Sequence, residues 1–328
     1  MRVLERVADV PGLRALRELA ARRPEPLWLV GGTVRDALLG RAPRDLDVAV
    51  EGDALAVARA LGEVVAEHAR FGTAEVRVDR AKVNLAAART ETYPSPGALP
   101  EVRLGATIEA DLRRRDFTVN AIAVGLRDGR EVAFPGALED LERRRLRVLH
   151  DASFLDDPTR LYRMVRYERR LGLAIEPRTA ALARAAQEGG ALYTLTRDRI
   201  AAELRLMLDE PDPVGTIAAV RAWVGRAAPA VDEELARAAL ELLDGEGRLE
   251  LVLVGSGCAG DERAAARDIQ WFDDSRPARR RAREVARAPQ LAEALRAARR
   301  PSEIAAAAVR RPLEAVALAG ALGAREPA

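Results

Sequence analysis

The chain has 328 residues, 48% of them hydrophobic, which is enough to bury a substantial core and to form two or three domains. The formal net charge is only +2, but just one of the 53 basic residues, Lys82, is a lysine, and the others are arginine. The single cysteine, Cys258, excludes a disulfide within the chain, and the two histidines, His68 and His150, argue against a zinc site. A catalytic metal would therefore be held by carboxylates.

The sequence contains no run of about 18 apolar residues, the length that a membrane-spanning helix needs. Residues 1–23 are charged and amphipathic, and they lack the apolar centre of a secretory signal. The acidic residues Glu5, Asp9 and Glu18 also distinguish this segment from a transit peptide. We therefore expect a cytoplasmic protein with no membrane partner.

Residues 1–148 alternate between apolar runs typical of strands and segments with helical spacing. The strand candidates, in chain order, are residues 27–30, 45–50, 74–79 and 121–126. Residues 90–107 carry three prolines and two glycines and are predicted to form a long loop. This part of the chain is therefore expected to be α/β or α+β.

The chain from residue 156 onward has the periodicity and the Ala, Leu and Arg content of helices, with a break predicted at residues 210–215. Gly255, Gly257 and Gly260 follow an apolar run with the spacing of a dinucleotide-binding fingerprint. No strand pattern follows them, so we expect a loop between two helices instead.

The stretch GGTVRDALLG joins the first predicted strand to a short helix, expected from Thr33 to Gly40. Gly31 and Gly32 would let backbone amides approach an anion at the start of that helix, with the Thr33 hydroxyl and Arg35 as further donors. Taken alone, the glycine pair fits an ordinary tight turn equally well.

The stretch DLDVAV places two carboxylates inside an apolar strand. Alternation puts Asp45 and Asp47 on one face and Leu46, Val48 and Val50 on the other, toward the core. Two adjacent carboxylates repel each other unless a cation lies between them, so the pair predicts a Mg²⁺ site completed by substrate phosphates. The alternative is an acidic, solvent-facing edge strand, and the glycine turn a little upstream favours the metal site.

A second polar cluster lies in RRRDFTVNA. Asp116 and Asn120 are spaced four residues apart and are predicted to share a helix face, with Arg114 and Arg115 beside them. A carboxylate and an amide can hold a ribose hydroxyl, and arginines can bind a triphosphate. The alternative is a surface helix with ordinary ion pairs.

A third cluster lies in FLDDPTRLYRMVRYERR. Asp157, followed by a proline at the first helical position, has the pattern of a helix N-cap. Arg160, Arg163 and Arg166 then recur every third residue, which fits either a basic binding surface or a solvated helix face.

These three motifs, in this order, resemble those of the class II tRNA nucleotidyltransferase and bacterial poly(A) polymerase family of the polymerase-β superfamily. The resemblance covers roughly residues 25–210, and residues 300–322 weakly resemble the helical body of that family. It implies an α+β fold, with a nucleotidyltransferase head and a small mixed sheet at residues 1–148. An all-helical neck for base recognition would follow at 149–210, and an RNA-binding helical body at 211–328.

The resemblance also implies an activity: Mg²⁺-dependent transfer of C, A or both from CTP and ATP to the 3′ end of tRNA, whose acceptor stem would be bound. Asp45 and Asp47 would hold the metal, Asp116 and Asn120 would select ribose, and Asp157 with Arg160 would read the base edge. The implied nucleotide-binding positions are Gly31, Gly32, Thr33, Arg35, Arg114, Arg115, Asp116, Asn120, Asp157, Arg160 and Arg163.

The chain departs from the family pattern at Asn84, where relatives often carry an acidic residue, and in ending soon after the body-like segment. Two alternatives therefore stay open: a poly(A) polymerase of the same family, and a catalytically silent RNA-binding relative. The motifs do not distinguish CCA, CC and A addition, and they say nothing about the oligomeric state.

Overall fold

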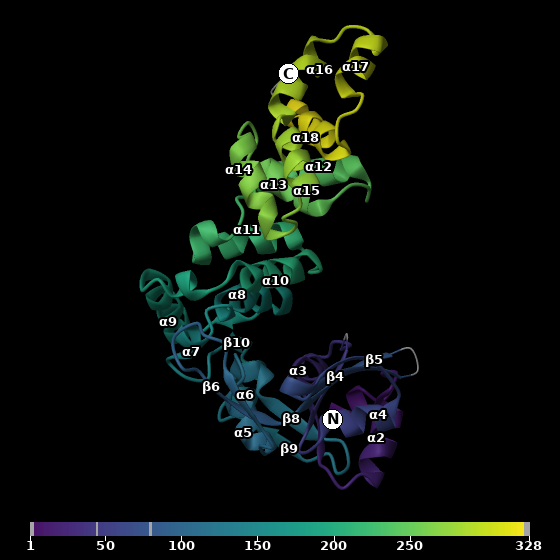
Figure 1. The fold of residues 1–328 in the computed structure, drawn as a ribbon, viewed down its shortest axis with the longest axis vertical. Coiled ribbons are helices and arrows are strands. Elements are labelled where there is room, and N and C mark those ends of the chain that lie inside the picture. Colours follow the sequence, from purple (N-terminus) through teal and green to yellow (C-terminus); the bar gives the residue numbers. More distant parts are fainter. Residues whose placement is uncertain (1–2, 44, 79–80, 325–328) are drawn as a thin grey trace. The chain divides into compact units, whose positions relative to one another are not determined.

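The computed structural model describes residues 3–43, 45–78 and 81–324 (Figure 1). The chain divides into two compact units, one built from the residues up to 157 together with 172–182, the other from 158–171 and the residues from 183 onward. The division into three domains at residues 148 and 210 stays a prediction.

The first unit combines strands with short helices. Its strands are β1 (Leu27–Val30), β2 (Leu46–Val50), β3 (Glu63–His68), β4 (Thr73–Val78), β5 (Ala81–Ala87), β6 (Arg89–Thr92), β7 (Glu101–Leu104), β8 (Ile122–Gly125), β9 (Glu131–Ala133), β10 (Arg145–Leu146) and β11 (Ala174–Ile175). Its helices are α1 (Val3–Arg6), α2 (Leu13–Arg22), α3 (Gly31–Leu38), α4 (Ala54–Leu61), α5 (Ile108–Arg113), α6 (Ala137–Glu142) and α7 (Ser153–Asp156), with the 3₁₀ turns η1 (Ala69–Phe71) and η2 (Thr118–Asn120).

The central sheet has seven strands in the order β3-β4-β5-β2-β1-β8-β9. The β2–β5 pair is parallel and the other pairs are antiparallel, so the sheet is mixed. This arrangement, followed by a helical second unit, confirms the expected α+β fold.

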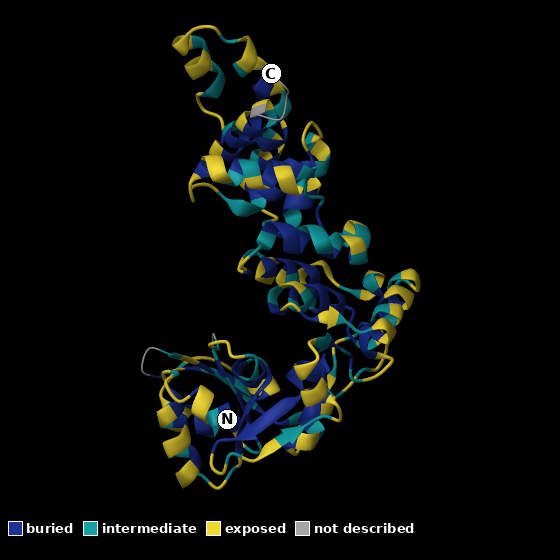
Figure 2. Ribbon diagram, turned by 180° about the vertical axis from the view of Figure 1, so that it is seen from behind, coloured by how far each residue is buried: buried dark blue, intermediate teal, exposed yellow. Residues whose placement is uncertain are grey.

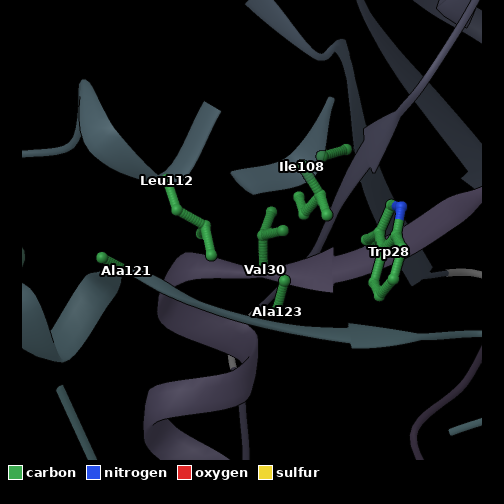
Figure 3. Close-up of a cluster of buried hydrophobic side chains, with 7 residues drawn as sticks. Trp28, Val30, Ile108, Leu112, Ala121 and Ala123 are labelled. Carbon is green, nitrogen blue, oxygen red and sulfur yellow. The ribbon is translucent and has the colours of Figure 1, made fainter. Parts of the chain in front are cut away.

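The two faces of the sheet carry different side chains. On one face, Trp28 and Val30 of β1 pack with Ala123 of β8 under Ile108 and Leu112 of α5 (Figure 3). Ala49 of β2 joins this cluster, whereas Leu46, Val48 and Val50, which are at most 1% exposed, lie on the other face. Strands β1 and β8 are buried along their length (Figure 2). These three residues of β2 thus face the core, as the alternation predicts.

The predicted strands are confirmed to within a residue, apart from Asp79, which lies outside the described residues. The long loop predicted at 90–107 is wrong in part. Strands β6 and β7 pair in an antiparallel hairpin there, and all three prolines fall in the segment that joins them. Alternating residues such as Arg-Thr-Glu-Thr favour a strand, and the proline content of the turn conceals it.

The second unit is helical throughout its described residues. Its helices are α8 (Arg160–Leu171), α9 (Pro177–Glu188, shared with the first unit), α10 (Arg197–Leu208), α11 (Pro213–Val224), α12 (Glu233–Leu243), α13 (Leu249–Gly257), α14 (Glu262–Asp268), α15 (Arg276–Ala286), α16 (Ala288–Ala297), α17 (Pro301–Ala308) and α18 (Leu313–Ala324), with the 3₁₀ turns η3 (Ala191–Thr194), η4 (Gly225–Ala227) and η5 (Ile269–Trp271). In the part of the chain that the structure describes, no helix is both long enough and apolar enough to cross a membrane.

The predicted break at 210–215 is confirmed, because Asp212 caps α11 by accepting a hydrogen bond from the N–H of Gly215.

The loop predicted around the three spaced glycines is wrong for the first two. Gly255 and Gly257 belong to α13, and the apolar run before them is helical, which rules out a dinucleotide fingerprint. A Cβ on Gly257 would lie 2.0 Å from the carbonyl oxygen of Ala230, so this glycine permits a close backbone contact.

Candidate active site

The aspartate pair lies where β2 begins, next to the turn that ends β1. Asp47 is the second residue of β2 and stands directly opposite Asn84 of β5. The Asn84 side-chain amide donates to Asp47 Oδ1 at 3.1 Å. Asp45 precedes the strand and lies in a bend, so the prediction that both aspartates belong to the strand is wrong by one position.

The Thr33 hydroxyl ties these two residues together. It accepts a hydrogen bond from the backbone N–H of Asp47 at 2.7 Å and donates to the backbone carbonyl of Asp45 at 3.0 Å. Thr33 is itself buried in α3. Its hydroxyl therefore fixes the backbone that carries both carboxylates, and its contact with a nucleotide stays a prediction.

The glycine turn leaves room for charged side chains. Helix α3 begins at Gly31 instead of Thr33, and Gly31 has a φ of +59°, which favours glycine. A Cβ on Gly31 would lie 3.0 Å from an Arg115 nitrogen, and a Cβ on Gly32 would lie 3.5 Å from Asp47 Oδ2. A side chain at Gly31 would therefore crowd the Arg115 guanidinium, whereas a Cβ at Gly32 would only be in van der Waals contact with the Asp47 carboxylate.

The electrostatics of Asp47 fit a bound cation. Burial raises the pKa of this carboxyl group, and the negative charge of Asp45 raises it further, against the opposing effects of Asn84, Arg115 and Arg35. Two carboxylates, one of them poorly solvated, match the oxygen ligands that a hard divalent cation prefers. No third carboxylate, histidine or cysteine joins them within the described ranges, so phosphates and water would complete the shell.

A pocket of about 360 Å³ opens on this face of the sheet, lined among others by Asp47, Asn84, Glu75 and Arg115. Glu75 of β4 stands opposite Asn84 and forms an ion pair with Lys82 at 2.8 Å. Sequence reasoning missed Glu75, because strand register and not sequence spacing brings it to this face.

Arg114 and Arg115 converge on one buried carboxylate. Asp111 is 1% exposed and lies 2.8 Å from Arg114 Nη2 and 2.9 Å from Arg115 Nη2. Burial alone would raise the pKa of Asp111, but the two guanidinium groups hold it below its ordinary value. Arg114 and Arg115 follow the last residue of α5 at spacings of three and four from Asp111, a spacing that could have revealed this anchor in the sequence.

The guanidinium of Arg115 is held by protein partners at the edge of the Asp47 pocket. Its Nη2 binds Asp111 and its Nη1 donates to the Asn120 carbonyl. Its Nε is buried and has no hydrogen-bond partner among the residues that the structure describes. Arg115 nevertheless lines the Asp47 pocket, so its positive charge is placed to attract a phosphate there.

Asp116 and Asn120 do meet, but not on a helix face as predicted. Asp116 lies in a bend and Asn120 ends the 3₁₀ turn η2, where its amide donates to Asp116 Oδ1 at 2.8 Å. Asn120 Oδ1 accepts from Arg35 at 2.6 Å, and Arg35 also binds Asp36 at 2.8 Å. All four side chains are buried, so Arg35 braces the Asp116–Asn120 pair from within, and their nucleotide contacts stay predictions.

The third motif spans the boundary between the two units. Asp157 is buried in the first unit, and α8 begins at Arg160 in the second, two residues later than expected. Arg163 pairs with Glu203 at 3.2 Å. Arg166 is buried between Glu203 and Glu210, so both predicted alternatives, an exposed basic surface and a solvated face, are wrong at this position. The capping and base-reading roles of Asp157 both stay predictions.

A mixed sheet with a glycine turn beside a paired-aspartate site defines a nucleotidyltransferase head, and residues 27–147 match the poly A polymerase head domain family. An A-adding tRNA nucleotidyltransferase of Halalkalibacterium halodurans is 44% identical over 214 residues, which are 62% of this chain and 50% of that protein. A CC-adding tRNA nucleotidyltransferase of Deinococcus radiodurans is 43% identical over 228 residues, which are 65% of this chain and 59% of that protein. The match thus spans less than two thirds of the length of these curated relatives.

Solved structures match over nearly the whole chain. A CCA-adding enzyme in its apo form II superimposes with a TM-score of 0.82 at 30% identity, covering 98% of this chain and 82% of that one. Other solved neighbours, 27% to 29% identical, are CCA-adding enzymes in complex with ATP, with CTP and, from Thermotoga maritima, with tRNA. The chain belongs to the class II tRNA nucleotidyltransferase and bacterial poly(A) polymerase family.

Proposed function

We propose that this chain is a Mg²⁺-dependent nucleotidyltransferase that adds C, A or both to the 3′ end of tRNA and releases pyrophosphate. The observation that carries the proposal is the Asp45–Asp47 pair, held by Thr33 and Asn84 beside an arginine-lined pocket. This arrangement suits the transfer of a nucleotidyl group, because catalysis of such phosphoryl-transfer reactions consists mainly of positioning the reactants and neutralising their charge.

Asp45 and Asp47 are the residues that would hold Mg²⁺. When bound, the ion favours deprotonation of the attacking 3′-hydroxyl and neutralises charge on the phosphates. Arg115, which lines this pocket, would contact a phosphate oxygen, and Asp111 keeps that side chain in place. The protein thereby orients the triphosphate against the 3′-hydroxyl.

The ribose and base would be read by residues outside this pocket. The Asp116–Asn120 pair presents a carboxylate and an amide for the 2′-hydroxyl, and Arg35 holds the pair in place. Asp157 and Arg160 would contact the base edge of CTP or ATP, as the family resemblance implies. Solved neighbours complexed with ATP, CTP and tRNA support these substrates.

The relatives that match include both an A-adding and a CC-adding enzyme, so the similarity alone does not indicate which nucleotides this chain adds. The test offers three tRNA transcripts, ending before CCA, after the first C and after CC, with each nucleoside triphosphate separately. We expect Mg²⁺-dependent extension with CTP, ATP or both, and the product length names the activity. Long adenosine tracts would instead support a poly(A) polymerase, and no extension of any transcript would contradict the proposal in favour of a silent RNA-binding relative.

A further inference from the structure

The only lysine of the chain, Lys82, lies on the face of the sheet that carries the aspartate pair. It belongs to β5 and precedes Asn84 by two residues, so the two side chains share a face. Asn84 stands opposite Asp47 in the parallel β2–β5 pair. Continuing that register by two residues puts Lys82 beside Asp45. The lysine therefore borders the proposed metal site, and the proposed chemistry does not use it.

Lys82 is held by Glu75 of the neighbouring strand β4. Its Nζ lies 2.8 Å from Glu75 Oε2, and the two side chains are 47% and 34% exposed. The hydrogen bond with Glu75 raises the pKa of Lys82. The negative charges of Glu75, Asp45 and Asp47 raise it further, against the opposing effect of burial. The lysine is therefore charged, and because an exposed ion pair contributes little to stability, a ligand can displace Glu75 at a small cost.

The order of the strands separates two sides of the aspartate pair. The glycine turn follows β1 on one side of β2, where an Arg115 nitrogen lies 3.0 Å from the position of a Cβ on Gly31. Strands β5 and β4, with Lys82, lie on the other side. In phosphoryl transfer the attacking and leaving oxygens lie roughly in line, on opposite sides of the phosphorus. With the triphosphate at the glycine turn, the acceptor strand approaches from the side of β5.

The pocket beside Asp47 extends over that side. Its lining includes Thr73 of β4 and His68 of β3, which stand opposite each other, and the small residues Ala66 and Ala86. Small side chains leave room above the strands for a sugar, and a hydroxyl and an imidazole can form hydrogen bonds with it. A lysine suits a phosphate that shifts as the acceptor grows, because its ammonium sits on a flexible stem and lacks the fixed geometry of an arginine fork.

We propose that Lys82 exchanges Glu75 for the phosphate that precedes the 3′-terminal ribose of the acceptor RNA, and so positions the attacking hydroxyl beside the aspartate pair. Glu75 holds the ammonium at the edge of the pocket until the acceptor arrives. This proposal rests on the proposed function for the identity of the acceptor.

The first test uses the fact that no other residue of the chain is a lysine. Acetic anhydride modifies the Lys82 amine and the N-terminal amine, and mass spectrometry of peptides distinguishes the two, so the N-terminal amine is an internal reference. We expect a tRNA transcript that ends in CC to slow acetylation of Lys82 several-fold. The same transcript without its unpaired 3′ nucleotides, and CTP or ATP with Mg²⁺, should not. Protection by the nucleotides or by the shortened transcript to the same degree overturns the proposal.

The second test removes the charge of the lysine. In Lys82→Gln the KM for the tRNA transcript should rise about tenfold, the loss expected for one charge-assisted hydrogen bond, while the KM for CTP and ATP stays unchanged. The dependence of log(kcat/KM) for tRNA on log[salt] should become shallower by about 0.7, the value for one phosphate of a single strand. A rise in the KM for CTP and ATP instead would assign Lys82 to the triphosphate and overturn the proposal.

A matched control loses a similarly exposed ion pair on the other face of the sheet. Arg59 lies 3.0 Å from Glu67, which stands opposite Ala74, the neighbour of Glu75. Arg59→Gln should therefore keep the KM values of the wild type.

Glu75→Gln breaks the same ion pair as Lys82→Gln but keeps the lysine. Its KM for tRNA should fall, because the carboxylate no longer competes with the phosphate for the ammonium. An equal rise of this KM in both variants would show that the pair only supports the sheet, and would overturn the proposal.

The acetylation readout needs no catalysis, so it separates this proposal from the proposed function. A wild-type protein whose Lys82 is protected by the 3′ end of tRNA but that extends no transcript contradicts the activity and supports the role of Lys82 in binding. Extension by the wild type without protection of Lys82 contradicts the role of the lysine alone.

Discussion

The two units of the chain hold their arginine side chains in different ways. In the first unit, Arg35, Arg114 and Arg115 are each fixed by buried carboxylates or amides before any ligand arrives. In the second unit, Arg310 and Arg311 are exposed and make no ion pair with a described residue. Transfer at a phosphorus atom needs fixed geometry, so the preset arginines of the first unit are the ones suited to that chemistry.

The largest effect is expected from removing the charge of the aspartate pair. Asp45→Asn or Asp47→Asn should lower the extension rate by about 10³-fold or more, because a metal supplies several kcal/mol of charge stabilisation in the transition state. The measurement is single-turnover extension of a tRNA transcript. Asparagine keeps the side-chain size, so the melting temperature should stay near that of the wild type. A variant that keeps both its rate and its Mg²⁺ dependence would contradict the assignment.

Asp111→Asn should show how much the anchoring of Arg115 by Asp111 contributes to folding stability and to nucleotide binding. Removing one partner of a buried ion pair costs about 3 kcal/mol of folding free energy, and the KM for CTP and ATP should rise because Arg115 loses its anchor. Glu109→Gln, which removes an exposed carboxylate on the same helix, serves as the control.

The difference in free energy of unfolding between the wild type and Asp111→Asn should depend on pH in a defined direction. The pKa of Asp111 is lowered in the folded protein, so its stabilising contribution is present above the ordinary pKa of an aspartate and is lost as the pH falls through the folded-state value. Urea unfolding at several pH values should therefore show the difference between wild type and Asp111→Asn shrinking in acid. A difference that does not change with pH would show that the charge of Asp111 contributes nothing.

A smaller effect is expected on base choice. Asp157→Ala and Arg160→Ala should each relax selection of C and A over U and G by about 1–3 kcal/mol, the value of a bidentate contact with a base edge. The measured quantity is the ratio of kcat/KM for the correct and the incorrect nucleotides. If that ratio is unchanged while the melting temperature falls, Asp157 is only a helix cap.

The smallest effect is expected at Asn84. Asn84→Asp replaces the amide that donates to Asp47 with a carboxylate, which adds negative charge at the same place. We expect the variant to be less stable without Mg²⁺ and to gain more in melting temperature than the wild type when Mg²⁺ is added. An identical Mg²⁺ titration for both proteins would show that Asn84 does not influence the metal site.

The sequence was most informative where a local pattern determines position. Alternation placed Asp47 on the face of β2 that points away from Leu46, Val48 and Val50. The four-residue spacing of Asp116 and Asn120 indicated their contact, although the predicted helix was wrong. It could not reveal Glu75, whose position depends on strand register, or the burial of Arg166, which depends on Glu203 and Glu210 from a distant segment. Pairing between distant residues is set by tertiary packing, and the sequence pattern does not display it.

The central claim is that Asp45 and Asp47 form a divalent-cation site built by the glycine turn and Thr33. Its most direct test is calorimetric titration of Mn²⁺, as a substitute for Mg²⁺, into the wild type and the Asp45→Asn/Asp47→Asn double variant, each with CTP present. The account predicts saturable Mn²⁺ binding to the wild type beyond that of free CTP and its loss in the double variant. Equal Mn²⁺ binding by both folded proteins would contradict it.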